Sequence, residues 1–295
     1  MLGHTDRVTS ESGGITAVLP TFNRAMALRE TMPRFLELED IDELVVVDDG
    51  STDGTAVLLE GLSADHPHLR VVRHATNQGL PTARNTGLGA VRTEWAVFLE
   101  DDCTVPRDYA TELRRVAESA GADIVGAPWL HVDPVSFEES LAGGRSTPVD
   151  VIDFHTGVSR FPAGPIATPF LCALALIKRR VFQELTYDTG YRVNAWREET
   201  DFFLRAVEHG FSCVLTPTTA SCQVRRWTGG TRGRMWYSEY WVIRNNWRFL
   251  RRHRSALAQH GVPSIEREQL GFTLSRLSGL CRHYAVVCRD RLARR

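Results

Sequence analysis

Short, continuously apolar segments alternate with helix-like segments through the N-terminal third of the chain, and this alternation constrains the fold more than any other feature. Runs that are apolar at every position are typical of strands buried on both faces. Such strands, alternating with helices, predict a mostly parallel sheet flanked by helices, an α/β fold. The predicted strands cover residues 15–19, 43–47, 69–73 and 95–99, and the predicted helices cover residues 25–38, 55–62 and 81–92.

The rest of the chain is less regular. Residues 127–168 are rich in Gly and Pro and predict a long surface excursion, which in a compact domain is usually functional or mobile. After it the pattern predicts an apolar run at 170–181, a helix at 199–209, a final strand at 211–215, and two helical stretches at 236–259 and 264–291.

The charge is unevenly distributed along a chain whose net charge is -1. Residues 223–295 contain 16 Arg and 4 acidic residues, a net charge of +12, so the remainder carries -13. A basic segment next to an acidic body predicts an anionic partner for that segment. Phosphate groups, an anionic lipid surface and the acidic body itself are the alternatives. A nucleic-acid partner is not expected, because the body is acidic and no aromatic–basic motif is present.

Several features bear on location and assembly. No run of about 18 apolar residues exists, so no transmembrane helix is expected. The first residues lack the apolar core of a signal peptide, and the six cysteines form no C-x-x-C pair, so we expect a cytoplasmic protein with reduced thiols. Near the C-terminus, apolar residues recur at alternating spacings of four and three residues and form a narrow apolar stripe along a helix. This stripe, the seam, could pack on the body, form a homodimer contact, or make peripheral contact with the inner face of a membrane. The seam comprises Leu270, Leu274, Leu277, Cys281, Tyr284 and Cys288.

Carboxylates follow two of the predicted strands. Asp48 and Asp49 follow the second strand in VVVDDGSTDGT, and Glu100, Asp101 and Asp102 follow the fourth in VFLEDDCTVP. Strand ends of a parallel sheet are where ligands bind, and hard oxygen ligands favour Mg²⁺ or Mn²⁺. The first pair alone is typical of a capped turn, whereas three consecutive acids need a counter-charge.

Two further segments carry candidate chemistry. In NQGLPTARNTGLG, Gly79 precedes a helix start, a natural anion site, and Arg84 could reach a phosphate or pair with Asp48 or Asp49. In WREETDFFLRAVEHGF, Glu198, Glu199 and Asp201 crowd a helix start. The helix dipole accounts for two of these acids, and one held near substrate could act as a general base.

Taken together, PTFNR (20–24), VVVDDGSTDGT, NQGLPTARNTGL, FLEDDC and REETDFFLR resemble family 2 glycosyltransferases of the GT-A fold, over residues 14–220. The resemblance implies a mostly parallel central sheet flanked by helices, with a C-terminal helical extension. It also implies four segments: a disordered N-terminus (1–13), a nucleotide-sugar-binding half (14–105), an acceptor and catalytic half (106–222), and a basic loop with helices (223–295).

The same resemblance assigns roles to residues. Thr21, Asp49 and Arg84 would line the nucleotide pocket, Asp101 would contact the ribose, and Asp102 would bind Mn²⁺ or Mg²⁺ at the diphosphate. Glu199 would be the catalytic base, with Asp201 or Glu198 as alternatives. A histidine ligand common in relatives is absent from SCQVRRW, which leaves the third metal ligand open. The remaining residues expected around the donor are Pro20, Asn23, Arg24, Asp48, Glu100, Arg226 and Trp227.

QVRRW matches the Q-x-x-R-W pattern of processive polysaccharide synthases. We expect Trp227 to offer a stacking surface and Arg225 or Arg226 to meet the diphosphate. After Gly229 and Gly230, Arg232 and Arg234 predict a basic loop that closes over the donor. The absence of a predicted membrane helix argues against processive secretion.

The implied activity is metal-dependent, inverting sugar transfer from a nucleoside-diphosphate sugar, with UDP as the family-weighted choice. The acceptor would be a hydroxyl of a glycan, a lipid-linked sugar or a small natural product. A nucleotidyltransferase or a non-catalytic sugar-nucleotide-binding protein are the alternatives. The first would normally carry a Gly-rich basic loop after the first strand, where this chain has PTFNR.

Overall fold

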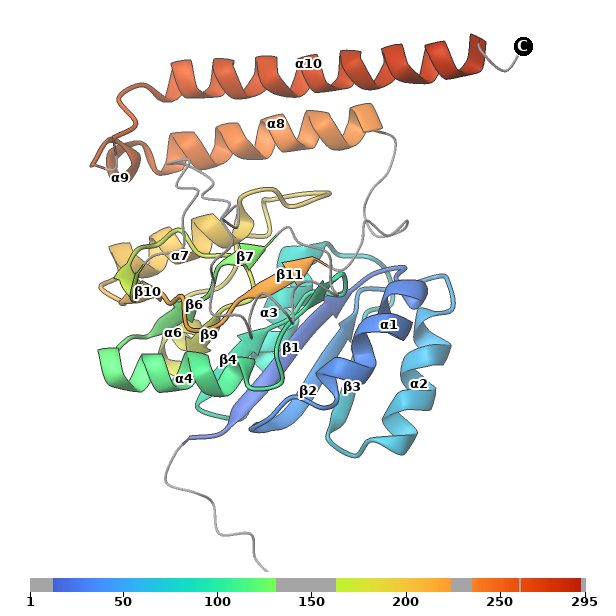
Figure 1. Cartoon of the computed structure of the whole chain (residues 1–295), viewed down its shortest axis with the longest axis vertical. Coiled ribbons are helices and arrows are strands. Elements are labelled where there is room, and N and C mark those ends of the chain that lie inside the picture. Colours follow the sequence, from blue (N-terminus) through green and yellow to red (C-terminus); the bar gives the residue numbers. More distant parts are fainter. Residues whose placement is uncertain (1–12, 131–162, 224–234, 260, 293–295) are drawn as a thin grey trace, which may run out of the picture.

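The computed structural model describes residues 13–130, 163–223, 235–259 and 261–292. An α/β body carries a separate layer of C-terminal helices on one side (Figure 1). The body begins with β1 (Ile15–Thr21), α1 (Ala25–Phe35), β2 (Ile41–Asp48), α2 (Thr55–Asp65), β3 (Leu69–Arg73), α3 (Leu80–Ala90) and β4 (Trp95–Phe98). The strand–helix alternation predicted for this region is confirmed.

The main sheet has eight strands in the order β3-β2-β1-β4-β9-β6-β10-β8. The neighbours β3, β2, β1 and β4 run parallel, as do β6 (Ile124–Gly126) and β10 (Cys213–Leu215). Two strands run against them: β9 (Leu176–Lys178) lies antiparallel between β4 and β6, and β8 (Ile166–Ala167) is antiparallel to β10. The prediction of a mostly parallel sheet is confirmed, and β9 joins its two parallel parts.

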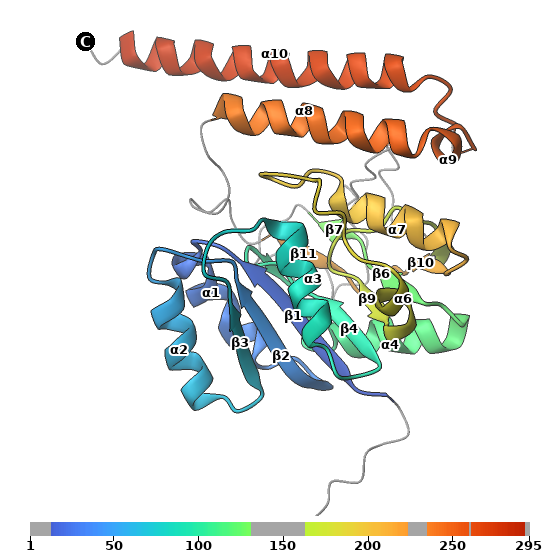
Figure 2. The same cartoon turned by 180° about the vertical axis from the view of Figure 1, so that it is seen from behind.

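Helices cover both faces of this sheet, as its continuously apolar strands require (Figures 1 and 2). Along β1, Ile15, Ala17 and Leu19 face a core shared with α1 and α4 (Tyr109–Ala120). Val18 faces the other core, which receives side chains of α3, α6 (Arg179–Glu184) and α7 (Glu198–Glu208). A Cβ at Gly87 of α3 would lie 2.3 Å from Val18, so glycine permits this close packing.

A second, three-stranded sheet lies beside the end of the main one. It pairs β5 (Cys103–Thr104) with β11 (Ser221–Gln223), and β11 with β7 (Trp129–Leu130). Cys103 pairs with Gln223 in this register. Gln223, the last residue of β11, therefore pairs with the residue that directly follows the acidic residues 100–102.

The C-terminal helices form a layer of their own. The predicted stretch 236–259 divides into α8 (Met235–Arg252) and α9 (Arg254–Gln259), and α10 (Ile265–Leu292) returns antiparallel to α8 (Figure 1). Phe249, Leu250 and Leu257 pack with Tyr191 and Leu204 of the body. No helix among the described residues is both long and apolar enough to span a bilayer.

The less regular middle of the chain contains elements that the pattern did not predict, notably α4 and the short strands β5 to β8. The proposed excursion at 127–168 begins with β7 and ends with β8, and its residues 131–162 lie outside the described part of the chain. The cysteines whose side chains are described, which excludes Cys288, are free thiols.

Candidate active site

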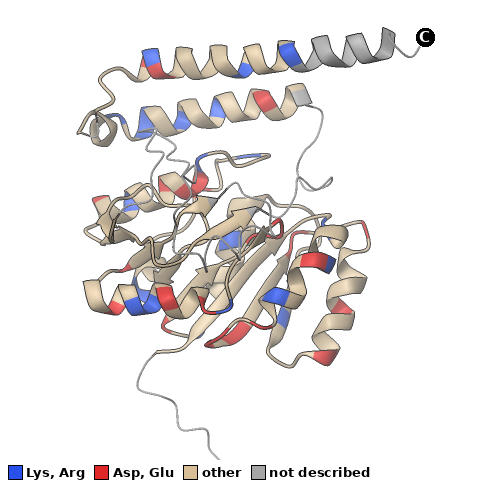
Figure 3. Cartoon of the chain, in the orientation of Figure 1, with Lys and Arg blue, Asp and Glu red and all other residues tan. Residues whose placement is uncertain are grey.

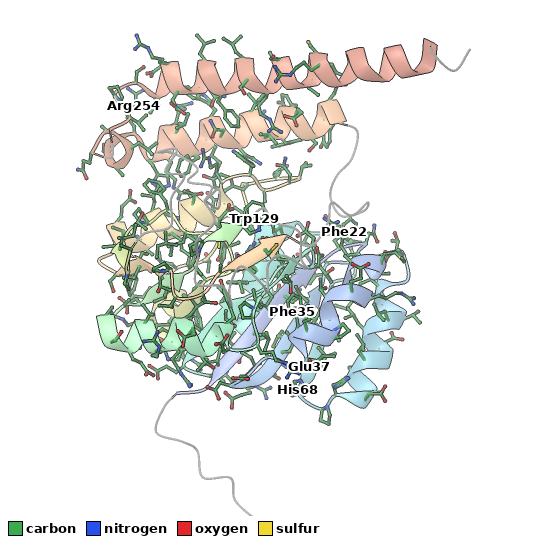
Figure 4. The ribbon with its side chains drawn as sticks, viewed as in Figure 1. Phe22, Phe35, Glu37, His68, Trp129 and Arg254 are labelled. Carbon is green, nitrogen blue, oxygen red and sulfur yellow. The ribbon has the colours of Figure 1, made fainter. Side chains whose placement is uncertain are left out.

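A cavity of about 360 Å³ opens at the carboxyl ends of β1 and β4, next to the first turn of α7. Phe22 and Trp129, two of its lining residues, lie at the end of the body nearest α8, whereas Glu37 and His68 lie at the opposite end (Figure 4). The predicted site residues that line the cavity are Pro20, Thr21, Arg24, Asp49, Arg84, Glu100, Asp101, Asp102 and Glu199. Strand ends on one edge of the sheet thus bring together residues far apart in sequence.

The acidic turn after β4 is held by hydroxyl and guanidinium groups. Thr21 Oγ1 donates a hydrogen bond to Asp101 Oδ2 at 2.8 Å. Arg24 lies 3.5 Å from Asp101 and 3.8 Å from Asp102. Burial raises the pKa of Asp101 to about 7, against the lowering effect of Arg24. The turn is therefore an anionic cluster with only partial compensation, a setting that favours a cation.

Glu100, Asp102 and Cys103 place one potential ligand atom each within 4.8 Å of one another. Burial raises the pKa of the Cys103 thiol well above its usual value, so the sulfur remains protonated and is a poor metal ligand. The carboxylates of Glu100 and Asp102 provide the hard oxygen atoms that Mg²⁺ and Mn²⁺ prefer. The residues present fit a divalent cation held through Asp102 and Glu100.

Arg84 connects the acidic turn to the start of α7. Its Nε donates to Glu198 Oε1 at 2.7 Å, and its Nη2 donates to Glu100 Oε1 at 3.1 Å. The guanidinium is 1% exposed and lies over the Phe98 and Tyr187 rings. The alternative that Arg84 pairs with Asp48 or Asp49 is wrong, because its Nε and Nη2 donate to Glu198 and Glu100 instead. Burial raises the pKa of Glu198 to about 8, although Arg84 acts to lower it.

Asp48, Asp49 and Asn23 organise the loops around the cavity. Asp48 Oδ1 accepts the Ser51 N–H, and Asp49 accepts the N–H groups of Gln78 and Gly79 ahead of α3. Asn23 Oδ1 accepts the N–H groups of residues 52 and 53. Asp49 also lines the cavity, but Asp48 and Asn23 do not.

A positive φ at Gly50 lets this turn approach the neighbouring backbone. Its φ is +74°, and a Cβ there would lie 2.5 Å from the carbonyl carbon of Thr76. Only glycine tolerates both the conformation and the contact. The turn and the segment before α3 are thereby locked together.

The three carboxylates at the start of α7 have different surroundings. Glu198 is buried against Arg84, and Glu199 is half-buried and lines the cavity. Asp201 is fully buried away from the cavity and accepts hydrogen bonds from Tyr191, Arg205, Arg252 and His253. Of these three, Glu199 alone lines the cavity that Asp102 lines.

A strained loop leads into α7 and supplies cavity residues that the sequence analysis missed. Val193, Ala195 and Arg197 have φ values of +63°, +51° and +75°, which L-residues rarely adopt. Asn245 of α8 bonds both backbone groups of Arg192, and Asn246 accepts from Arg197 Nε at 3.2 Å. The cavity residues missed from sequence are Phe22, Leu80, Ala83, Trp129, Cys172, Ala173, Leu174, Asn194, Trp196 and Arg197.

The remaining predictions fall on a part of the chain that the structure does not describe. Arg225, Arg226, Trp227, Arg232 and Arg234 all lie within residues 224–234. The roles of these five residues stay predictions.

Relatives of known sequence include two proteins of Rhizobium meliloti. The succinoglycan biosynthesis protein ExoM is 26% identical over 263 residues, covering 85% of this chain and 76% of ExoM. ExoO, also a succinoglycan biosynthesis protein, is 34% identical over 111 residues, which cover 37% of this chain and 31% of ExoO.

Solved structures with the same architecture are glycosyltransferases. The mannosyltransferase PcManGT of Pyrobaculum calidifontis, in complex with GDP-Man and Mn²⁺, gives a TM-score of 0.60 at 20% identity, covering 95% of this chain and 80% of that one. S. aureus TarS in complex with UDP-GlcNAc gives 0.57 at 15% identity, covering 81% and 72%. The fold is therefore the GT-A fold.

The family itself follows from the sequence match. The model of glycosyl transferase family 2 matches residues 16–186, which are more than half of the chain and include β1 from its second residue and all of β2 to β4. The matched segment includes both acidic turns and Arg84 of α3, so it contains most of the polar wall of the cavity. The chain is a glycosyltransferase and belongs to glycosyl transferase family 2.

Proposed function

We propose that this glycosyltransferase moves a sugar from a nucleoside-diphosphate sugar to an acceptor hydroxyl, with a divalent cation at Asp102 and Glu199 as the base. One observation carries the proposal: Asp102 and Glu199, which are about 100 residues apart in sequence, line the same cavity. Had they lain on opposite sides of the body, no single substrate could contact both.

Each step of the proposed transfer would involve residues that line the cavity. Glu199 accepts the proton of the acceptor hydroxyl as that oxygen attacks the anomeric carbon. The bond from the anomeric carbon to the diphosphate breaks on the opposite face, and its electron pair leaves with the diphosphate, so the configuration inverts. A bound Mg²⁺ or Mn²⁺ would neutralise charge on the leaving diphosphate. Thr21, Asp49 and Asp101 surround the region proposed for the nucleoside.

The buried Arg84–Glu198 pair favours Glu199 over its neighbours as the base. Glu198 is engaged by Arg84, and Asp201 is engaged by two arginines and a histidine. A base must reach the proton that it removes, within about 3 Å or through one water. Glu199 is the carboxylate of the three that can meet a substrate in the cavity.

The donor base is proposed to be uracil. PcManGT is described with GDP-Man and TarS with UDP-GlcNAc, so both purine and pyrimidine donors occur among the structural neighbours. Thermal unfolding with Mn²⁺ and UDP, GDP or ATP distinguishes them. Stabilisation by UDP above GDP supports the proposal, and stabilisation by ATP alone would instead favour a nucleotidyltransferase.

Glu199→Gln tests the assignment of the base. The amide cannot accept the proton, so we expect kcat to fall about 10²–10⁴-fold, the usual contribution of a general base. Donor affinity, measured by calorimetry with Mn²⁺, should stay within about threefold of wild type, close to the uncertainty of such contributions. Glu60→Gln on the exposed side of α2 is the matched control and should leave kcat unchanged. Full turnover by the Glu199 variant would contradict the proposal.

A further inference from the structure

Large apolar side chains gather on the outside of the C-terminal helix pair. Of the ten large hydrophobic residues that are exposed among the described part of the chain, six lie on α8 and α10. They are Trp236, Tyr237 and Tyr240 on α8, at 51–54% exposure, and Leu270, Leu274 and Leu277 on α10, at 40–60%. Soluble surfaces carry such residues singly, whereas a cluster marks an interaction site.

Both groups of side chains point away from the body. On α8, Phe249 packs on the body, and Tyr240 lies nine residues earlier, roughly 180° around a helix with about 100° per residue. On α10, Phe272 contacts Trp196 of the body, and Leu270 and Leu277 are rotated from Phe272 by roughly 140–160°. The two stripes therefore share the outer side of the helix pair.

A groove between the helices joins the stripes into one surface. It encloses about 280 Å³ and is lined by Tyr240, Ile243, Arg244 and Trp247 of α8 and by Gln269 of α10. We call the surface formed by this groove and the two stripes the outer helix face. In Figures 1 and 2 the two helices lie together at one end of the molecule, with α8 nearer to the body than α10.

Arginines are interleaved with the aromatic rings of the outer helix face. Arg244 donates to the Tyr240 hydroxyl at 2.8 Å and lies over the Trp241 ring, and Arg251 lies over the Trp247 ring. The acids Glu239 and Glu266 of the same helices are each paired with an arginine, Arg276 and Arg254. Figure 3 shows the contrast between basic α8 and the acids of the body.

We propose that the outer helix face binds an anionic lipid bilayer, with α8 and α10 lying parallel to its surface. Trp and Tyr favour the boundary between headgroups and acyl chains, where the ring is apolar and the polar group stays hydrated. The leucines enter the acyl region, and the arginines meet lipid phosphates. The net charge of +12 over residues 223–295 complements such a surface.

A second copy of the chain fits this face less well. A twofold contact would bring Arg244 and Arg251 of each copy toward the same residues of the other, while Glu239 and Glu266 are already paired with arginines. A contact limited to the leucine seam of α10 would leave Trp236, Tyr237 and Tyr240 exposed. A bilayer covers both stripes at once and supplies the missing negative charge.

The contact would also hold the cavity one helix layer away from the membrane surface. Asn194, Trp196 and Arg197 line the cavity, and the loop that carries them is bonded to α8 through Ser238 and Asn246. The outer helix face and the cavity mouth are thus parts of one continuous structure. Membrane binding needs no turnover, so it can be measured independently of the proposed function.

Co-sedimentation of the full chain with vesicles tests the proposal. Vesicles of phosphatidylcholine with about one-third phosphatidylglycerol should bind the protein, and vesicles of phosphatidylcholine alone should bind it at least tenfold less. Arg244→Gln/Arg251→Gln should weaken anionic binding about 30-fold at low salt, since each surface arginine contributes roughly fivefold. Binding should also weaken as salt is added.

A second variant tests the apolar contribution. Trp236→Ser/Tyr237→Ser/Tyr240→Ser should reduce anionic binding at least tenfold, with an unchanged circular dichroism spectrum. Met26→Ser/Val57→Ser removes exposed apolar side chains from α1 and α2 and should bind as wild type. The melting temperature measured with Mn²⁺ and UDP should be the same in every variant. A failure of membrane binding can therefore be distinguished from a failure of the proposed function.

Several results would overturn the proposal. Wild-type protein that stays in the supernatant, or that binds neutral and anionic vesicles equally, would remove the anionic bilayer as the partner. Binding that survives both the arginine and the aromatic variants would place the contact elsewhere. A wild-type dimer in analytical ultracentrifugation that the aromatic variant dissociates, with no vesicle binding, would identify the face as a self-interface.

Discussion

Two acidic turns that look alike in sequence, residues 48–50 after β2 and residues 100–102 after β4, are stabilised in different ways. The first accepts the backbone N–H groups of Ser51, Gln78 and Gly79. Two side chains from the end of β3 and just after it also contact it: Arg73 lies 3.3 Å from Asp48, and His74 lies 2.7 Å from Asp49. The second depends on side chains, because Thr21, Arg24 and Arg84 provide its partners. One turn fixes the path of the chain, and the other holds negative charge at the wall of a cavity.

The difference shows what a run of acids at a strand end requires. Only the Ser51 N–H comes with the turn itself, whereas those of Gln78 and Gly79 come from the segment before α3, about 30 residues further along the chain. Buried carboxylates that face one another need counter-charges from elsewhere, here from the segment after β1 and from α3. Such an arrangement is specified only by the whole fold. It is also the arrangement that an added cation stabilises most.

Arg84→Met should give the largest effect, because it removes the counter-charge of the second turn. Glu198, 1% exposed, loses the guanidinium that donates to it, and Glu100 loses a partner as well. Removing one member of a buried ion pair lowers the free energy of unfolding by about 3–5 kcal/mol. Urea denaturation measures the change.

The double variant Arg84→Met/Glu198→Met is its control. Replacing both charges with apolar side chains of similar size leaves no buried carboxylate unpaired, so we expect at least half of the lost stability to return. A single variant that loses less than about 1 kcal/mol, or a double variant that is less stable than the single, would show that Arg84 is not the counter-charge of this cluster.

Asp102→Asn and Asp48→Asn compare the two turns directly. Asp102→Asn should lower kcat/KM about 10³-fold, equivalent to about 4 kcal/mol, through weaker cation and donor binding, with little change in stability. Asp48→Asn should lower the free energy of unfolding by about 1–3 kcal/mol, because its amide NH₂ would meet either the Ser51 N–H or Arg73.

Steady-state kinetics with varied Mn²⁺ and urea denaturation of both variants provide the measurements. We expect opposite outcomes. The Asp102 variant should lose activity and keep its stability, whereas the Asp48 variant should lose stability and keep kcat/KM within about tenfold of wild type. Equal losses of activity in the two variants would contradict the proposal that residues 48–50 have a structural role and residues 100–102 bind the cation and the donor.

The first turn could be predicted from sequence, and much of the second could not. Strands β1 to β4 and the helices between them follow from apolar periodicity, and the carboxylates at the strand ends follow from where those strands stop. The pairing of Arg84 with Glu198 joins residues 114 positions apart, and no local pattern specifies it. The antiparallel β9 was likewise hidden, because a buried strand is apolar whichever way it runs.

The cavity's aromatic and loop residues were missed for a related reason. Trp129 and Trp196 are isolated in sequence, and only the pairing of β7 with β11 and the strained loop before α7 bring them to the cavity. The three acids at the start of α7 were correctly predicted as a group. Their separate environments depend on α3, α8 and His253, which sequence spacing does not reveal.

Asp201 provides the smallest expected effect, a pH dependence of stability. Burial alone would raise its pKa, but hydrogen bonds from His253 and Arg205, with the charge of Arg252, hold the pKa below the usual 3.8. A depressed pKa means that the ionised group stabilises the fold fully above the unfolded value and less as the pH falls through the folded one. The stability difference between wild type and Asp201→Asn should therefore shrink as the pH falls below about pH 4. Urea denaturation on both sides of pH 4, with Glu60→Gln as the control, measures it, and a difference that grows below pH 4 would show that Asp201 does not anchor α7 to α8 through its charge.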